Sequence, residues 1–428
     1  MDDPGLTIAM LSVHTCPMGD LGARDAGGMN VYVRELALAL EALGHRVDLF
    51  TRAHGSGHEE VWSLGTETKL VHLRAGWDGP LPKTEVFGLL PGFAQSLESF
   101  RGRNKRRYDL VHSHYWLSGW VGRWAAARWG VPHVMMFHTL GAVKNAIGAG
   151  PTEPALRLNA EKVLIESSHH VVVATDREGR EMLEAYGVGP HSLSVVPCGV
   201  NLDLFQPQDR LEARRSLGLS PEETVFLYVG RFDPIKGLDR LLEAGAILKE
   251  SRSFRLLVVG GDDGQHETRR LKSLAWAAGL KEMTEFVGRV AHEQLPQYYS
   301  AADAFILPSY HESFGMAALE SLACGTPVIA GPVGGLTEIL AVEGCGCLVH
   351  NSSPSALAEA MEAFMDRPAE ERWSPQDIRS AVTRFTWSRI ARAIVDEYRR
   401  ALATRSGRNG PPPVSWPADP PRKAAGEN

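Results

Sequence analysis

Short apolar segments alternate with amphipathic segments of helical period along most of the chain, and this alternation constrains the fold more than any other feature. Such an order is typical of a parallel sheet whose strands are joined by crossover helices. In the first half we predict strands at residues 7–12, 46–51, 109–113, 133–137, 170–174 and 192–196. We also predict helices at residues 31–43 and 176–186, each followed by a glycine. The predicted fold class is therefore α/β.

The alternation stops after residue 196 and restarts at residue 224, which divides the chain into two halves. Turn-forming residues dominate 197–207, so we place the linker between two domains there. In the second half we predict strands at residues 224–229, 255–259, 284–287, 304–307 and 327–330. The N-terminal domain would span residues 1–197 and the C-terminal domain would begin at residue 198. Residues 404–428, rich in proline, are expected to form a disordered tail.

Length and composition exclude several classes of protein. At roughly 150 residues per domain, 428 residues give two or three domains, so a miniprotein held by disulfides or metals is excluded. A hydrophobic content of 44% excludes disorder for the bulk of the chain. The net charge of -6 argues against a general nucleic-acid binder, so any bound anion must be held by local groups.

The cysteines and the hydropathy pattern favour a cytoplasmic protein. Five scattered cysteines fit reduced thiols better than a disulfide framework. No stretch reaches the roughly 18 consecutive apolar residues of a membrane span, and no basic segment followed by an apolar run opens the sequence. We therefore expect neither export nor stable membrane insertion. A homodimer is compatible with the sequence.

Ligands of open parallel sheets bind beyond the carboxyl ends of the strands, so residues that follow strands are the first candidates for a site. His14 follows the first strand, and a glycine-containing loop then leads through Gly28 into a helix. Backbone N–H groups at such a helix start can hold an anion. The alternative is an ordinary flexible loop. Because the glycine spacing is not G-x-G-x-x-G, a nicotinamide site is disfavoured.

Two cations, Arg231 and Lys236, follow the first strand of the second half. A guanidinium fork and an ammonium group at this place could neutralise a diphosphate. They could equally be solvated surface charges, since Lys and Arg are commonly exposed.

Two carboxylates follow a later strand of the second half. Glu312 lies on the predicted loop, and Glu320 lies two turns into the next predicted helix. Ser313 is a candidate N-cap, and Gly315 would leave the first turn open to a ligand. The carboxylates could accept hydrogen bonds from sugar hydroxyls, or they could be ordinary exposed acids.

Histidines end two strands of the first half, with His112 and His114 on one strand and His138 after another. No complete set of zinc ligands is evident, so no metal site is predicted. His138 is either a hydrogen-bonded core histidine or, because of its place at a strand end, a catalytic group.

Together these segments resemble retaining glycosyltransferases of family 4, which have the GT-B fold of two Rossmann-like domains facing a cleft. The resemblance extends to about residue 402 and rests on the Gly27-Gly28 loop, the Arg231 to Lys236 segment and the E-x7-E spacing of Glu312 and Glu320. It implies that the N-terminal domain binds the acceptor and that the C-terminal domain, residues 198–386, binds a nucleotide sugar. It also implies that a helix at residues 387–403 crosses back onto the N-terminal domain.

The N-terminal half is more similar still to the members of this family that act on inositol 3-phosphate in mycothiol synthesis. The matching segments are residues 14–17, 25–32 and 138–145, whereas residues 18–24 and 146–154 depart from the pattern. This resemblance implies transfer of N-acetylglucosamine from UDP-N-acetylglucosamine to 1D-myo-inositol 3-phosphate. The acceptor phosphate would be held by Lys83, Tyr115, Thr139 and Arg157. Two cations and two hydroxyls are also a sensible cage for a phosphomonoester.

The resemblance assigns the remaining roles. Catalysis would fall to Arg231, Lys236, His138 and Glu312. The donor would contact Gly28, Arg231, Lys236, Val290, Glu312, Phe314, Gly315, Met316 and Glu320. The acceptor would contact His14, Asp25, Asn30 and the four phosphate ligands. Because the sequence contains no D-x-D motif, no catalytic metal or other cofactor is predicted.

Other acceptors and other classes of protein remain open. Sucrose-phosphate synthases and lipid mannosyltransferases share the motifs of the second domain. A protein that binds a nucleotide sugar without turnover would be expected to lack either the two cations or one glutamate. A UDP-sugar epimerase would lack a separate phosphate cage.

Overall fold

The computed structural model describes residues 5–405, except residues 20–26, 54–59, 77–78, 80, 263, 342–343, 352, 369–370 and 372. The predicted acceptor residue Asp25 lies outside the described residues, as does the predicted tail from residue 406 onward.

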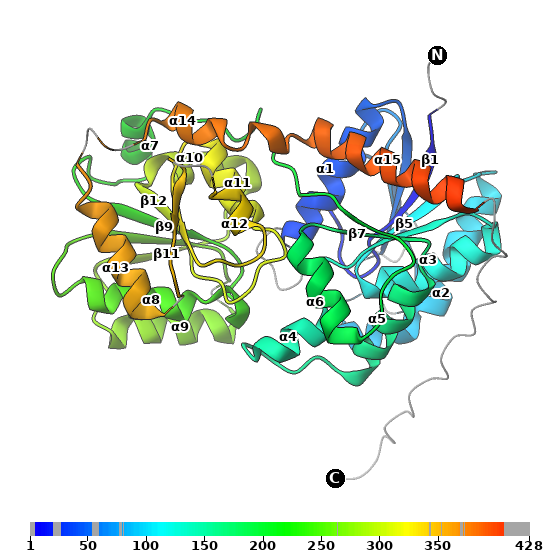
Figure 1. Ribbon diagram of the computed structural model, residues 1–428, viewed down its shortest axis with the longest axis horizontal. Coiled ribbons are helices and arrows are strands. Elements are labelled where there is room, and N and C mark those ends of the chain that lie inside the picture. The colour runs from blue at the N-terminus through cyan, green and yellow to red at the C-terminus, as the bar shows by residue number, and fades with distance from the viewer. Residues whose placement is uncertain are drawn as a thin grey trace, which may run out of the picture.

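Two α/β domains lie side by side, each built on its own sheet (Figure 1). In the first domain the strand order is β3-β4-β2-β1-β5-β6-β7-β8, and β3 alone of the described strands is antiparallel to its neighbour. The strands are β1 (Thr7–Leu11), β2 (Arg46–Arg52), β3 (Glu60–Ser63), β4 (Lys69–Leu73), β5 (Leu110–His114), β6 (His133–Met136), β7 (His170–Val173) and β8 (Leu193–Val195). The helices are α1 (Gly28–Ala42), α2 (Lys83–Arg103), α3 (Trp116–Trp129), α4 (Gly141–Ile147), α5 (Ala155–Ser167) and α6 (Asp176–Tyr186).

The second domain is a parallel sheet with strand order β11-β10-β9-β12-β13-β14. Its strands are β9 (Val225–Val229), β10 (Arg255–Val259), β11 (Thr284–Gly288), β12 (Ala304–Leu307), β13 (Val328–Ala330) and β14 (Gly346–Leu348). Its helices are α7 (Arg210–Ser216), α8 (Leu238–Leu248), α9 (His266–Ala277), α10 (Leu295–Ala301), α11 (Met316–Ala323), α12 (Leu336–Ile339), α13 (Pro354–Met365) and α14 (Pro375–Ser380). Short 3-10 turns are η1 (Pro234–Lys236), η2 (His292–Gln294) and η4 (Thr383–Phe385).

The two-domain α/β prediction is confirmed. Three short strands of the described structure were not predicted from the sequence. β3 and β4 form a hairpin at one edge of the first sheet, and β14 forms an edge of the second. Val61 and Trp62 of β3 are exposed, and β14 has only three residues. The edge strands β3 and β14 carry little buried apolar periodicity, so the sequence pattern does not reveal them. This reason does not extend to β4, which lies inside the sheet and is mostly buried.

Two chain segments connect the domains, and they pair with each other. The first follows β8, and the second leads into α15 (Trp387–Arg405), which packs against α1 of the first domain. The backbone N–H of Val200 donates to the carbonyl oxygen of Phe385 over 2.8 Å. The helix predicted at residues 387–403 corresponds to α15, which runs as a long ribbon across the first domain in Figure 1.

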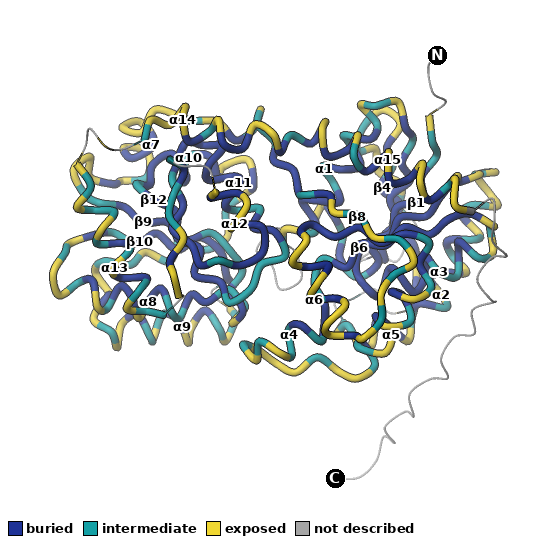
Figure 2. Tube along the Cα trace, in the orientation of Figure 1, coloured by how far each residue is buried: buried dark blue, intermediate teal, exposed yellow. Residues whose placement is uncertain are grey.

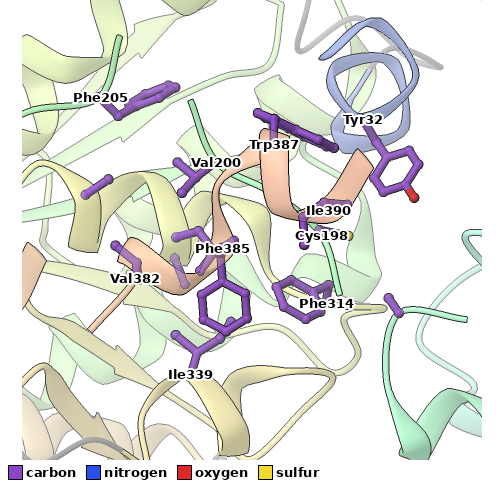
Figure 3. Close-up of a cluster of buried hydrophobic side chains, with 14 of the residues drawn as sticks. Tyr32, Cys198, Val200, Phe205, Phe314, Ile339, Val382, Phe385, Trp387 and Ile390 are labelled. Atoms are coloured by element: carbon purple, nitrogen blue, oxygen red, sulfur yellow. The ribbon is translucent and has the colours of Figure 1, made fainter. Parts of the chain in front are cut away.

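An apolar cluster surrounds these two connections (Figure 3). Trp387 lies between the linker and Tyr32 of α1, whose ring centroid is 5.4 Å away. A Cβ atom on Gly199 would lie only 2.6 Å from the Trp387 ring, so this close approach requires glycine. The cluster joins the cores of both domains into one buried apolar set. Buried residues are concentrated in the central strands of both sheets (Figure 2).

Within the described residues, no helix combines the length and the apolar character that a membrane span requires.

Candidate active site

A cleft with a volume of about 320 Å³ lies between the domains and is lined by residues of both. Its walls come largely from segments that follow β1, β5, β6, β9, β11 and β12, as expected for the carboxyl ends of parallel strands. Every predicted site residue that the structure describes lines this cleft: His14, Gly28, Asn30, Lys83, Tyr115, His138, Thr139, Arg157, Arg231, Lys236, Val290, Glu312, Phe314, Gly315, Met316 and Glu320. The structure therefore brings the predicted donor and acceptor residues into one cavity.

The N-terminus of α1 faces the second domain across the cleft. A Cβ atom on Gly27 would lie 3.3 Å from Nε of Arg231, and one on Gly28 would lie 3.5 Å from Sδ of Met316. Backbone N–H groups at the positive end of this helix dipole thus lie beside a guanidinium group. The combination is suited to an anion that bridges the two domains.

Asn30 holds the loop that precedes α1. Its side chain is fully buried, and its Oδ1 accepts from the Gly27 N–H over 3.1 Å. Its Nδ2 donates to Thr15 Oγ1 over 2.9 Å and to the Cys16 carbonyl over 2.7 Å. The structure thus uses Asn30 to position the helix start, while its predicted contact with an acceptor hydroxyl stays a prediction.

Lys236 and Glu312 form an ion pair at the second-domain wall. Nζ of Lys236 donates to both carboxylate oxygens, over 2.8 and 2.9 Å, and Ser309 Oγ donates to one of them over 2.7 Å. Burial alone would raise the pKa of Glu312, but the charge and hydrogen bonds of Lys236, with the Ser309 bond, hold that pKa below its ordinary value. Glu312 is therefore a carboxylate at neutral pH, and Lys236 keeps one further N–H donor.

Glu320 projects from α11 and is held by two partners. Its oxygens pair with Nε2 of His292 at 2.9 Å and accept from the Tyr299 hydroxyl over 3.0 Å. Burial would lower the pKa of His292, but the charge of Glu320 raises it overall. Gly315, with φ of +111°, precedes this helix and packs against Leu336, so glycine is needed at that turn.

His138 is held from both domains. Its backbone adopts the left-handed region, with φ of +61°, which is uncommon for a residue other than glycine. Its carbonyl oxygen accepts a hydrogen bond from Ser313 Oγ of the second domain, and its Nε2 lies 2.9 Å from Nδ1 of His114. Burial lowers the pKa of His138 to about 3, so the ring is neutral at physiological pH.

The predicted phosphate ligands gather around the ring of Tyr115. Nζ of Lys83 lies 5.5 Å and the Arg157 guanidinium carbon 4.9 Å from the ring centroid, and the His14 ring lies 4.4 Å away. Nη2 of Arg157 donates to the Thr139 carbonyl over 2.9 Å and to Thr139 Oγ1 over 3.1 Å. All four predicted ligands are thus close together.

Arg157 is anchored by carboxylates as well. Its Nε donates to Glu161 over 2.7 Å, and its Nη1 pairs with Glu153 at 2.9 Å. Glu153 also accepts from Nζ of Lys144 over 2.6 Å. Burial would raise the pKa of Glu153, but Arg157 and Lys144 hold it below its ordinary value. Arg157 is thereby fixed in orientation, with most of its N–H donors already used.

Sequence reasoning missed two cations that line the cleft, Lys144 and Arg289. Lys144 lies within the segment 138–145 that carried the family resemblance, and Arg289 directly follows β11. The strand-end rule could therefore have found Arg289, which pairs with Asp262 at 3.2 Å.

Further contacts close one side of the cleft. Arg177 of α6 donates to the Pro332 carbonyl over 2.8 Å, and Glu181 of the same helix pairs with His311 at 3.3 Å. Nη2 of Arg34 lies 3.3 Å from Nδ1 of His292. The domains therefore touch directly beside the site residues. Among the described residues, no group of three or more His, Cys, Asp or Glu side chains is arranged to hold a metal ion.

Comparison with known proteins assigns this architecture to a class. A family model described as Glycosyltransferase Family 4 matches residues 26–204, and one described as Glycosyl transferases group 1 matches residues 209–378. A sucrose-phosphate synthase from Thermosynechococcus elongatus superposes with a TM-score of 0.86 at 36% identity, covering 93% of this chain and all of that one. An Anabaena HepE structure in complex with UDP and glucose shares the fold at a TM-score of 0.71 and 18% identity, covering 92% of this chain and 99% of that one. The predicted GT-B fold is confirmed.

Curated relatives are similar over nearly the whole chain. "D-inositol 3-phosphate glycosyltransferase 2" of Catenulispora acidiphila is 40% identical, covering 92% of this chain and 95% of the relative. A D-inositol 3-phosphate glycosyltransferase of Nocardioides sp. is 41% identical, covering 94% and 91%. The chain belongs to glycosyltransferase family 4, and it is an enzyme of the glycosyltransferase class.

Proposed function

We propose that this chain transfers N-acetylglucosamine from UDP-N-acetylglucosamine to 1D-myo-inositol 3-phosphate with retention of the anomeric configuration. One observation carries the proposal: the Lys83, Tyr115, Thr139 and Arg157 group of the first domain shares a cleft with Arg231 and Lys236 of the second. A transferase that uses a phosphorylated acceptor and a nucleotide-sugar donor needs two such anion sites within reach of each other. The names of the curated relatives support the same acceptor.

The donor diphosphate would lie between the α1 N-terminus and the second-domain cations. Arg231, close to Gly27, and Lys236 would stabilise the charge that develops on the leaving diphosphate. Glu312 would accept hydrogen bonds from the sugar hydroxyls, beside Phe314 to Met316, and Glu320 would bind the ribose. The choice of UDP and of N-acetylglucosamine follows from the family resemblance.

The acceptor phosphate would lie against the ring of Tyr115, between Lys83 and Arg157. A phosphomonoester carries two negative charges near neutral pH and accepts several hydrogen bonds, which this group of cations and hydroxyls can supply. Lys144, 2.6 Å from Glu153, adds a third cation to the same wall of the cleft.

The reaction needs no nucleophilic side chain under this proposal. The acceptor hydroxyl attacks the anomeric carbon on the face that the diphosphate leaves, the carbon–oxygen bond to the diphosphate breaks, and a diphosphate oxygen takes the acceptor proton. The protein's part is to hold the two substrates in line and to exclude water. The side chains and the helix N-terminus carry the charge stabilisation, so we propose that no metal or cofactor is required.

The similarity to sucrose-phosphate synthase favours one second candidate, in which the acceptor is a hexose phosphate. Both candidates use a phosphomonoester, so the cage alone does not distinguish them. We also propose a cytoplasmic location, where the five free cysteines would stay reduced.

A donor and acceptor panel scored by product mass tests the proposal. UDP-N-acetylglucosamine and UDP-glucose would each be combined with inositol 3-phosphate, unphosphorylated inositol and fructose 6-phosphate. We expect product from UDP-N-acetylglucosamine and inositol 3-phosphate, and little from inositol, because inositol lacks the phosphate group that Lys83 and Arg157 would bind. A preference for inositol, or for fructose 6-phosphate, would overturn the proposed acceptor and leave the glycosyltransferase assignment intact.

A further inference from the structure

His114 is a buried histidine that does not line the cleft, and the only hydrogen-bond contact of its ring among the described residues is with His138. Its Nδ1 lies 2.9 Å from Nε2 of His138. Its Nε2 is buried and has no hydrogen-bond partner among the described residues. The ring of Tyr32 packs edge-on against both histidines, with centroids 5.8 Å from His114 and 5.2 Å from His138, and so covers one side of the pair.

The burial decides where the proton of His114 lies. Burial lowers the pKa of His114 well below its ordinary value, so the ring is neutral and carries one N–H. A proton on Nε2 would be a buried donor without a partner, which native structures rarely contain. A proton on Nδ1 is instead donated to His138, and the uncovered atom is a lone pair.

We propose that His114 is a positioning residue that fixes His138 as the Nδ1–H tautomer. Because Nε2 of His138 accepts from His114, the single proton of the neutral His138 ring must lie on Nδ1. Nδ1 is then the ring nitrogen of His138 that can form a hydrogen bond with a ligand in the cleft. His138 therefore presents a fixed N–H donor to an oxygen of the bound sugar or acceptor, and it cannot take a proton through that atom.

The backbone supports this arrangement from the other side. The carbonyl oxygen of His138 accepts a hydrogen bond from Ser313 of the second domain, which is adjacent to Glu312. The ring of His138 contacts His114, which belongs to β5 of the first domain. Domain contact and the His114 hydrogen bond thus fix the residue at both ends. Left-handed backbone at a residue other than glycine persists where its surroundings impose it.

NMR of the full-length protein labelled with nitrogen-15 histidine tests the inference directly. His138→Gln would assign the His138 ring signals, and the free enzyme needs no substrate for this measurement. The expected spectrum has Nδ1 protonated and Nε2 bare in His138. A His138 ring protonated at Nε2 would overturn the inference, whatever the true substrates are, so this outcome is separate from failure of the proposed function.

Variants of His114 connect the tautomer to turnover. Asn has an amide group near the position of Nδ1 and can donate to His138, so H114N should keep the Nδ1–H signal and nearly normal kcat. H114L cannot donate, and we expect a mixture of tautomers and a roughly fivefold to tenfold lower kcat, the effect of one lost hydrogen bond. His133→Leu is the matched control, because His133 is equally buried and bonds Ser113 outside the cleft.

The two His114 variants also distinguish positioning from a packing role. Rescue by H114N, with H114L impaired in kcat more than in KM, supports the proposal. Equal losses in H114N, H114L and the His133 control would contradict it. If H114L fails to fold, the His138 tautomer of the wild-type protein and the kcat of H114N still distinguish a positioning role from a packing role.

Discussion

Replacing Lys236 by Met removes an ammonium group and keeps most of its side-chain volume. Lys236 contacts both oxygens of Glu312 at 2.8 and 2.9 Å, and the Glu312 side chain is only 10% exposed. The substitution therefore leaves a buried carboxylate with Ser309 as its remaining side-chain partner. Breaking a buried pair by removing one partner costs about 3 kcal/mol at neutral pH. Loss of a charge that stabilises the transition state should also reduce kcat about a hundredfold or more.

In this variant the contribution of Glu312 to folding stability should depend on pH with the opposite sign. In the wild type the pKa of folded Glu312 is lowered, so the pair contributes stability above the ordinary value of 4.5, and that contribution is lost as pH falls through the folded pKa. Without Lys236, burial is the main remaining influence and places the folded pKa above 4.5. The destabilisation should then be small near pH 4 and grow by up to about 1.4 kcal/mol per pH unit until the folded pKa is reached.

The double variant K236M/E312Q separates stability from catalysis. It buries no unpaired charge, so its unfolding temperature should recover toward the wild-type value, while kcat stays low. Thermal unfolding at several pH values and initial rates with UDP-N-acetylglucosamine provide the two readouts. Normal turnover in K236M would refute the assignment of Lys236 to the diphosphate. Parallel stability curves for K236M and the wild type would refute the electrostatic argument.

Three further outcomes follow from the same site. Lys83→Met should lower kcat/KM for inositol 3-phosphate at least about tenfold and leave slow donor hydrolysis nearly unchanged; an equal loss of both activities would argue against a phosphate contact. Turnover should survive a strong chelator, whereas loss with rescue by magnesium would reveal a metal requirement. UDP should reduce the radius of gyration measured by small-angle scattering, because the domains turn about residues 197–207 as the cleft closes; an unchanged value with UDP bound would indicate a preformed cleft.

The rule that ligands bind beyond the carboxyl ends of parallel strands carried much of the site prediction. It placed Arg231 and Lys236 after β9 and Glu312 after β12, and these side chains do meet in one cleft. The phosphate cage depended on the family resemblance, because Lys83 begins α2 and Arg157 lies within α5, where strand ends give no signal.

The partners of the site residues could not be predicted in the same way. Glu153 and Glu161 orient Arg157, and His114 contacts His138, through side-chain pairs that depend on how helices and strands pack. Neither the hydrophobic periodicity nor the composition of the sequence reveals such a pair. Asn30 shows the converse, since a polar residue at a promising position is buried and bonded to the chain's own backbone.

A competition experiment tests the central claim most directly. UDP-N-acetylglucosamine would be offered with equal concentrations of inositol 3-phosphate and fructose 6-phosphate, and the products would be followed by proton and phosphorus NMR, which reports both the acceptor used and the anomeric configuration. We expect N-acetylglucosaminyl inositol phosphate with the configuration of the donor retained, and no product from fructose 6-phosphate. Transfer to fructose 6-phosphate, or an inverted anomeric centre, would contradict the account.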